Sequence, residues 1–574
     1  MSETTLVHER VDDIPLLIGL LQRLHFAEVL NRHLDSHGNH RGLSNGTLAT
    51  VWLAFILCMG DHRKSTVEAW VEKHHDTLAR LLEVTIRPTD FTDDRLGIVL
   101  KYLGSESSWN DIEEDLWREN MQVLPPGDAE PMSVRVDATT VTGYHAVTEE
   151  GLMQLGHSKD HRPDLGQFKL MAAAVQPGGG MVATSIHSGE SADDPLYVPI
   201  IRRVRQILKT TGVLYSGDCK MAASKIRADI AFHRDEYLTP LPMTGDTAKS
   251  MEAWIAAAVD GRVDCVAIED HDRTLGKGYE FSRELSENID NQRFTWQERV
   301  LIIWSTDAAG RQATALEKKL TEAERAIVAL TPPPGRGKRA VTDESELRQE
   351  IDVTLQKFDV SGLLSVALET RETTTTKYVG KGRGSAARAK TQDVSRRYFV
   401  QAISRNETAI ARRKEFLGWR AQATNCSPSR LSLAGSVIEY RKGWCLERNF
   451  HVVKDKPLGI APMFVHNDDQ INGLTHLLLL GARVLSHIEL CTREKLANSG
   501  QTIKGLYKGQ LTRETVSPTA TKLLEKVADA QITLTEIRVG RKVTRHITPL
   551  PQSVIQILSY LGMDPACYAT LANN

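Results

Sequence analysis

The stretch Ser133-Val-Arg-Val-Asp137 decides the fold that is predicted for this chain. Polar and apolar residues alternate along it, as they do in a half-buried β-strand, and the stretch ends in an acid. Two more strands are predicted, from Gln167 to Gln176 and from Met181 to His187, with a hairpin turn at Pro177-Gly-Gly-Gly180 between them. The sheet therefore begins with three consecutive strands, and the first of them delivers Asp137.

Helices and strands alternate in the segment that follows. The patterns predict a helix over Pro195 to Lys209, a short strand over Gly212 to Gly217 that runs into Asp218, a helix over Met221 to His233 and a strand over Glu236 to Leu241. Three strands with a hairpin, followed by helix, strand, helix and strand, form the layout of a ribonuclease-H-like mixed sheet with helices on its faces. We therefore expect an α/β fold with such a core.

The rest of the 574-residue chain surrounds or interrupts this core. A chain of this length is expected to form several domains. The predicted organisation is a helical N-terminal domain over 1–130, the first part of the core over 131–245, an inserted subdomain over 246–432, the last part of the core over 433–500, and a C-terminal region over 501–574. The C-terminal region contains a predicted hairpin, Thr533 to Ile547, that turns at Gly540.

The composition is that of a globular protein, with 41% hydrophobic and 25% charged residues. The net charge of −2 is uninformative, but residues 331–430 carry 19 Lys and Arg against 11 Asp and Glu, an excess of eight positive charges. A local excess of this kind attracts a polyanion. None of the seven cysteines forms a CxxC pair, the first residues lack the features of a signal peptide, and no apolar run reaches about 18 residues. We expect a cytoplasmic protein without a membrane span, associated with the nucleoid when bound to DNA.

Three carboxylates occupy positions where they could share a metal ion. Asp137 ends one predicted strand, Asp218 follows another, and Glu447 lies on a predicted helix from Gly435 to Asp455. Oxygen ligands of this type suit Mg²⁺, with Mn²⁺ as the alternative, and paired ions in such sites stabilise phosphoryl transfer. An isolated acid after a strand is as often a turn or cap residue. The three acids together are what favours a metal site.

The predicted helix places Glu447 between Tyr440 and Lys454, each seven residues away. Seven residues fall only about 20° short of two full helical turns, so the three side chains are expected on one face. An acid flanked by an aromatic hydroxyl and a cation suits a metal ligand that lies against a phosphate backbone. Packing for Tyr440 and a solvated surface for Lys454 are the alternative readings.

The chain resembles insertion-sequence transposases of the DDE superfamily, in the group with a Tyr-Arg-Glu-Lys signature. The signature Y-x2-R-x3-E-x6-K matches Tyr440, Glu447 and Lys454 at its spacings. The stretch Gly156-His-Ser-Lys-Asp-His-Arg-Pro-Asp164 and the pair Thr424-Asn425 are also similar to motifs of these transposases. The resemblance covers roughly residues 130–490. It implies a ribonuclease-H-like core with an insertion before the Glu helix, Mg²⁺-dependent cleavage at transposon ends, and strand transfer into target DNA.

The chain departs from the signature at one position, because Gly443 stands where the pattern has an arginine. Arg441 points about 200° away from position 443 on a helix and does not simply replace it. This departure favours the alternative of an inactive or nuclease-only relative that still binds DNA. A third reading is a DNA-binding protein without catalysis, in which the acids are structural.

Further candidate DNA contacts surround these acids. Arg441 and Arg448 flank Glu447, and His157, Lys159 and Arg162 form a polar cluster expected near Asp137 with its cations toward DNA. Trp296, Trp304 and Trp419 are candidates for stacking on a flipped base, whereas Trp444 is assigned to the core or to an interface. The expected partners are terminal inverted repeats and target DNA, and the helical N-terminal domain over 1–130 is the candidate for recognising the DNA ends. A homodimer is expected, because two transposon ends must be brought together.

Overall fold

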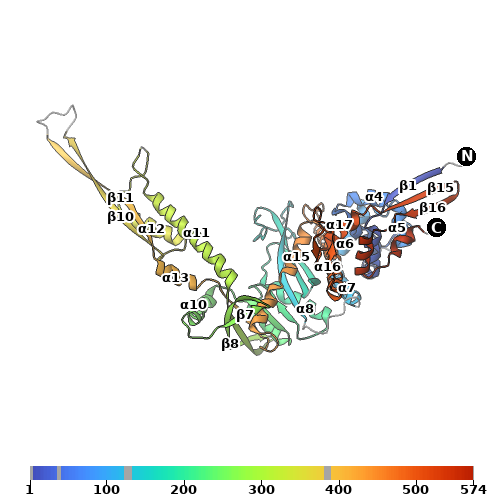
Figure 1. The fold of residues 1–574 in the computed structure, drawn as a ribbon, viewed down its shortest axis with the longest axis horizontal. Coiled ribbons are helices and arrows are strands. Elements are labelled where there is room, and N and C mark those ends of the chain that lie inside the picture. Colours follow the sequence, from blue (N-terminus) through green and yellow to red (C-terminus); the bar gives the residue numbers. More distant parts are fainter. Residues whose placement is uncertain are drawn as a thin grey trace. The chain divides into compact units, whose positions relative to one another are not determined.

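The computed structural model describes residues 4–34, 41–121, 132–176, 178–335, 337–379 and 389–572 (Figure 1). The chain forms two compact units. The first contains Met1–Thr239, Glu284–Trp296 and Ile438–Asn574, and the second contains Pro240–Arg283 and Gln297–Val437. The second unit overlaps the segment 246–432 that the sequence analysis sets apart. The predicted domain bounds themselves stay predictions.

The first unit contains the mixed sheet in which Asp137 lies. Its strands, in the spatial order β4-β3-β2-β5-β6, are β4 (Gly180–Ser188), β3 (Gly166–Gln176), β2 (Ser133–Gly143), β5 (Leu214–Ser216) and β6 (Glu236–Pro240). β2, β3 and β4 pair antiparallel, whereas β5 runs parallel to both β2 and β6. The helices α8 (Asp194–Leu208) and α9 (Ser224–Phe232) connect the parallel strands. The expectation of an α/β fold with a mixed sheet is confirmed.

The strand β2 is longer than predicted. It continues past Asp137 to Gly143 and pairs with β3 without a shift in register from Ser133↔Gln176 to Gly143↔Gly166. The residues after Asp137 are Ala-Thr-Thr-Val-Thr, and β-branched residues of this kind extend a strand readily. Asp137 therefore lies within a strand, and the prediction that it ends one was wrong.

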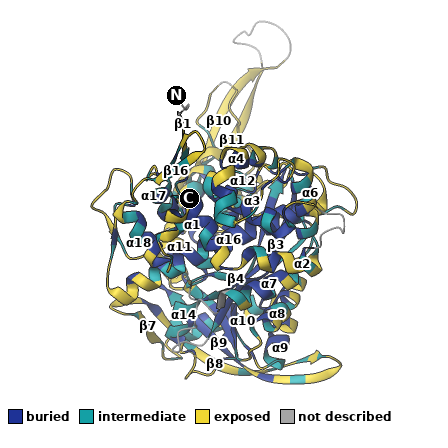
Figure 2. Ribbon diagram, turned by 90° about the vertical axis from the view of Figure 1, so that its right-hand side faces the viewer, coloured by how far each residue is buried: buried dark blue, intermediate teal, exposed yellow. Residues whose placement is uncertain are grey.

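Helices from both ends of the first unit share one hydrophobic core. The long helix α16 (Asp468–Ser499) lies within this core, and 19 of its residues are buried (Figure 2). Within the described residues it is the one helix long and apolar enough to cross a membrane, but 89% of its apolar window is buried inside the fold, as in a core helix. The other helices of this unit are α1 (Ile14–Arg23), α2 (Phe26–His33), α3 (Asn45–Met59), α4 (Lys64–Lys73), α5 (His75–Leu82), α6 (Asp93–Leu103), α7 (Glu106–Met121), α14 (Leu433–Arg441, from Ile438 onward), α15 (Trp444–Lys454), α17 (Ala520–Ala528), α18 (Gln552–Tyr560) and α19 (Ala566–Ala569), with a 3-10 turn at Thr570–Ala572.

A small sheet joins the two ends of the described chain. β1 (Thr4–Arg10) pairs antiparallel with β15 (Thr533–Val539), which forms a hairpin with β16 (Lys542–Ile547). The predicted hairpin at Gly540 is confirmed, whereas β1 was not predicted. A second small ladder pairs β13 (Ile503–Lys504) with β14 (Glu514–Thr515).

A buried charge cluster ties the helices of the first unit to its sheet. The Glu113 carboxylate on α7 is fully buried and forms ion pairs with Arg203 on α8 and Arg483 on α16. It also accepts a 2.7 Å hydrogen bond from the Thr184 hydroxyl on β4. Because each buried charge is partnered, the cluster fixes how these four elements pack.

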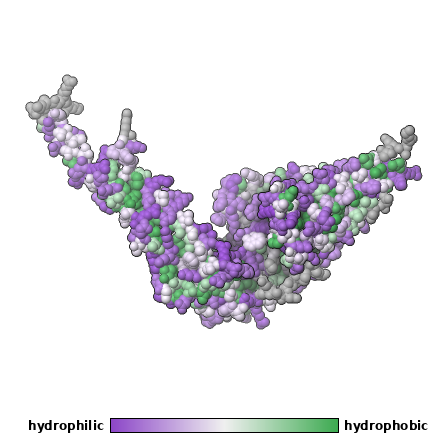
Figure 3. Space-filling view, viewed as in Figure 1, coloured by the Kyte–Doolittle hydropathy of each residue, from purple (hydrophilic) through white to green (hydrophobic). Residues whose placement is uncertain are grey.

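The second unit contains the long hairpin of β10 (Leu364–Tyr378) and β11 (Lys390–Arg405). Most of its residues are exposed, and its surface is largely hydrophilic in Figure 3. Residue 336 and residues 380–388 of the basic segment 331–430 lie outside the described residues. The other elements are α10 (Gly245–Val259), β7 (Val266–Asp270), β8 (Arg273–Ile289), β9 (Gln292–Ser305), α11 (Thr306–Leu330), α12 (Glu344–Lys357), α13 (Glu407–Glu415) and β12 (Trp419–Thr424); the tips of β8 and β9 belong to the first unit.

Candidate active site

The helix predicted from Gly435 to Asp455 is broken in two. α14 ends at Arg441 and α15 begins at Trp444, with a turn at Lys442 and Gly443 between them. Here the Gly443 amide donates to the Tyr440 carbonyl over 3.3 Å and the Leu446 amide to the Gly443 carbonyl over 3.2 Å. Both bonds span three residues, which is a tighter winding than that of an α-helix. A glycine, the least helix-favouring residue after proline, stands at the break.

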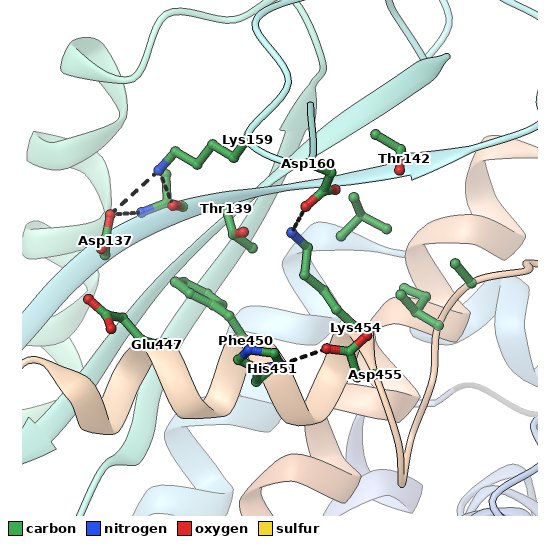
Figure 4. A pocket seen from close by; sticks show the side chains of 14 residues that line it. Asp137, Thr139, Thr142, Lys159, Asp160, Glu447, Phe450, His451, Lys454 and Asp455 are labelled. Atoms are coloured by element: carbon green, nitrogen blue, oxygen red, sulfur yellow. Dashed lines mark hydrogen bonds and ion pairs between the residues drawn. The ribbon is translucent and has the colours of Figure 1, made fainter. Parts of the chain in front are cut away.

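The break changes which side chains share a face. Glu447 and Lys454 both belong to α15 and line one open pocket of about 480 Å³, as their spacing of seven predicts (Figure 4). Tyr440 belongs to α14 and is absent from the residues that line this pocket. The prediction of a single face shared by all three residues was therefore wrong for Tyr440.

Asp137 and Glu447 enter the pocket from opposite walls. Asp137 comes from β2, and Glu447 comes from the first turn of α15 with its carboxylate directed toward that strand (Figure 4). Glu447 is exposed and has no hydrogen bond or ion pair with another residue in the described part of the chain. The other residues that line the pocket are Ala138, Thr139, Val141, Thr142, Lys159, Asp160, Phe450, His451, Lys454, Asp455, Ile460 and Ala461.

The pKa of Asp137 is raised above its ordinary value, first because the carboxylate is largely removed from water. The ammonium group of Lys159 lies 3.7 Å from Asp137 Oδ1 and acts in the opposite direction. The negative charge of Asp218 raises the pKa further. Asp137 and Asp218 are therefore close enough to repel each other, which is the electrostatic situation that a bound cation relieves.

Asp218 follows β5 and is held by two neighbours. Its Oδ1 accepts a 2.7 Å hydrogen bond from the Tyr197 hydroxyl on α8 and a 2.9 Å bond from the Lys220 amide. Burial and the charge of Asp218 raise the pKa of Tyr197 well above its ordinary value, so this phenol stays protonated and remains a donor. Sequence reasoning missed Tyr197, because nothing in the helix pattern marks which residue reaches the strand end.

The donor set fits a hard divalent cation. Carboxylate oxygens are the ligands that Mg²⁺ prefers, and it binds protein through one or two carboxylates while it keeps several waters. In the described residues no three His, Cys, Asp or Glu side chains already converge on one point. Asp137 and Glu447 line the pocket, and Asp218 stands beside Asp137 without lining it. Asp137 and Glu447 are thus carboxylates of the pocket that could hold such an ion, and the assignment of Asp218 as a third ligand stays a prediction.

Two of the predicted cations lie in this pocket. The Lys159 ammonium donates to the Ala138 carbonyl next to Asp137, and its backbone amide donates to the Thr140 hydroxyl over 3.0 Å. Lys454 forms a 2.5 Å ion pair with Asp160. These contacts hold the loop after residue 156 against β2 and α15. Of the predicted polar cluster of His157, Lys159 and Arg162, Lys159 is the member that reaches Asp137.

The other predicted DNA contacts lie outside the pocket. Arg448 forms an ion pair with Glu489 on α16, so it belongs to the packing between α15 and α16; its prediction as a DNA contact is at odds with that position. Arg162 makes two hydrogen bonds of 2.8 and 2.7 Å with Asp164. Arg441 and His157 are exposed.

Two of the three tryptophans that are candidates for stacking are buried. Trp296 donates a 2.9 Å hydrogen bond to the Tyr237 hydroxyl, and Trp419 donates to the Glu415 carbonyl over 2.9 Å. Trp304 is partly buried and donates to the Leu417 carbonyl over 3.0 Å. By contrast, Trp444 at the start of α15 is 51% exposed, so it is not a core residue, and its assignment to an interface stays a prediction.

Comparisons with known proteins add one distant likeness. No protein-family model matches the sequence, and no curated protein matches it. Among solved structures, the chain is similar to the piggyBac transposase in a synaptic complex with hairpin DNA, at a TM-score of 0.33 and 6% sequence identity. The match covers 90% of this chain and 80% of that chain. A TM-score this low assigns neither a fold family nor a function.

Proposed function

We propose that the chain is a DNA transposase of the insertion-sequence type, which cleaves transposon ends and joins them to target DNA. The observation that carries the proposal is the pocket in which Asp137 and Glu447 face each other beside Lys159 and Lys454. Acids that can hold a divalent cation, next to lysines that can hold phosphates, are the requirements for phosphoryl transfer on DNA. The strand order β4-β3-β2-β5-β6 supports the ribonuclease-H-like reading of the core.

The acids and lysines in and beside the pocket have separate roles in this mechanism. Asp137, Asp218 and Glu447 would hold Mg²⁺, which would supply charge stabilisation at the phosphoryl group that is transferred. Tyr197 keeps Asp218 oriented through its 2.7 Å hydrogen bond. Lys159 lowers the pKa of Asp137 against the effect of burial and, together with Lys454, offsets the charge of the DNA backbone. Catalysis then rests on positioning and on charge stabilisation.

The test uses the full chain and a labelled duplex made from the DNA that flanks the gene. We expect nicking that requires Mg²⁺ and falls at least about a thousandfold in Asp137→Asn, Asp218→Asn and Glu447→Gln, because an electrostatic group at the reacting phosphate contributes on that scale. Matched controls are Asp529→Asn and Glu494→Gln, which remove charges far from the pocket in sequence. If the wild-type chain never nicks, or if the three variants cut as well as it does, the proposal fails.

The same preparation tests the assembly. Two ends must be joined, so we expect two chains and two duplexes in the complex, measured by light scattering. A complex of one chain with one duplex would contradict a paired-end mechanism. The alternative of a relative that binds DNA without cleaving it, which Gly443 favours, predicts binding without nicking under every metal condition.

A further inference from the structure

Arg135 is a buried cation whose charge acts on Asp137 but two of whose guanidinium nitrogens lack a hydrogen-bond partner among the described residues. It lies on β2 two residues before Asp137, and because side chains alternate along a strand, both point to the same face of the sheet. Arg135 is only 5% exposed, yet its Nε and Nη1 atoms have no hydrogen-bond partner among the described residues. A buried guanidinium without such partners is costly, so its retention calls for a ligand.

The guanidinium of Arg135 occupies the space beside the helix break. A Cβ atom added to Gly443 would lie 3.1 Å from Arg135 Cζ and 3.2 Å from its Nε. The Tyr440 ring lies under the same guanidinium, with its centroid 4.8 Å from Cζ. Any side chain at position 443 would therefore compete with Arg135 for this space, whereas glycine accommodates it.

The immediate acids are already engaged. Glu439 accepts a hydrogen bond from the Ser133 hydroxyl and pairs with Lys442 over 2.9 Å. Asp137 has Lys159 at 3.7 Å. The N-terminus of α15 also begins at Gly443 without a side-chain cap, which adds partial positive charge at this point. The surroundings of Arg135 thus favour an added anion.

We propose that Arg135 supplies, from the strand, a guanidinium that binds a DNA phosphate, in place of the arginine that the signature has at position 443. This inference rests on the proposed function, since the anion is a phosphate of the DNA next to the cut site. A guanidinium offers two parallel N–H donors to one phosphate, which a lysine cannot match. Gly443 then leaves the space that the Arg135 guanidinium occupies, and Arg135 takes the place of the missing signature arginine.

The first test measures binding of the full chain to the end duplex as a function of salt. Arg135→Gln is expected to weaken binding about 10–100-fold, the range for a hydrogen bond to a charged group, and to reduce the slope of log K against log salt by about one. Arg135→Lys should restore the slope but only part of the affinity. Arg202→Gln, an exposed arginine on α8, is the matched control with no change.

A second measurement separates ligand binding from a structural role. Replacing single phosphates next to the cut site by neutral methylphosphonates should weaken binding of the wild-type chain, and at one position should have no effect on Arg135→Gln. The Tm of Arg135→Gln without DNA should be unchanged or raised, because a buried charge has been removed. A lowered Tm with an unchanged salt slope and unchanged methylphosphonate response would overturn the inference.

A third experiment places an arginine at position 443, where the signature has it. Gly443→Arg alone should lower the Tm, because two guanidinium groups then share one space. In the Arg135→Ala background, Gly443→Arg should be tolerated and should recover at least a tenth of wild-type affinity. One outcome is that the wild-type chain nicks in a way that depends on the three acids while the effects of the changes at positions 135 and 443 simply add. In that case only this inference fails, and the proposed function stands.

Discussion

The Tyr197 hydroxyl donates a 2.7 Å hydrogen bond to Oδ1 of Asp218, so a helix residue orients an acid at the end of a strand. Tyr197→Phe removes this bond and keeps the ring, which is fully buried. A hydrogen bond to a charged group contributes about 1.5–3 kcal/mol, and we expect nicking to fall about 10–100-fold. The Mg²⁺ concentration at half-maximal nicking should rise, whereas DNA affinity should not change. Equal losses in affinity and nicking would contradict a positioning role.

Lys159 lowers the pKa of Asp137 and thereby the pH at which this acid ionises. Its positive charge lowers the pKa of Asp137 against the effect of burial, so Lys159→Met should raise that pKa further. Nicking needs the ionised carboxylate, and the acidic limb of the pH profile should therefore move to higher pH. A profile that keeps its position while the rate falls uniformly would show that Lys159 acts on DNA alone. Lys508→Met, which removes a surface lysine paired with Asp529, is the control.

The local patterns near the mixed sheet predicted most of its elements. Gln167 to Gln176 and Met181 to His187 became β3 and β4 within a few residues, because alternation and a glycine-rich turn act over short distances. β1 was missed, since Thr-Thr-Leu-Val-His-Glu-Arg is largely polar and its partner β15 lies more than 520 residues away. The sequence of either strand alone does not indicate a pairing over that distance.

The sequence predicted the acids of the candidate site but not Arg135 and Tyr197, which lie next to them. Asp137 and Glu447 could be chosen by residue type and spacing, but the helix break depends on how Gly443 meets Arg135, a contact between residues 308 positions apart. Alternation along β2 does place Arg135 on the same face as Asp137, and that signal could have identified it. No comparable signal marks Tyr197.

The buried Glu113 cluster predicts a large effect on stability away from the pocket. Glu113→Gln leaves Arg203 and Arg483 without their shared counter-charge. Removing one partner from a buried charge cluster typically costs about 3–5 kcal/mol, and urea unfolding should show a loss of this size. Glu114→Gln is the matched control, because Glu114 is partly exposed and pairs with Lys209 on the surface, where about 0–1 kcal/mol is expected. Similar losses in the two variants would contradict the assigned burial.

The raised pKa of Asp137 indicates that this acid reduces the stability of the fold until a cation is bound. Because its folded-state pKa is raised, the folded chain holds this proton more tightly than the unfolded chain does. Below the ordinary aspartate pKa of about 3.9 both states are protonated and Asp137 has no effect; as the pH rises from there to the folded-state pKa, the unfolded chain ionises first and the cost to the folded state grows, and above the folded-state pKa this cost is complete. Asp137→Asn should therefore raise the Tm above that pKa in the absence of Mg²⁺, with a difference that shrinks toward acid pH. Mg²⁺ should raise the Tm of the wild-type chain and leave that of the variant almost unchanged. If the variant is less stable at neutral pH, or responds to Mg²⁺ as the wild type does, Asp137 is neither a destabilising charge nor a ligand.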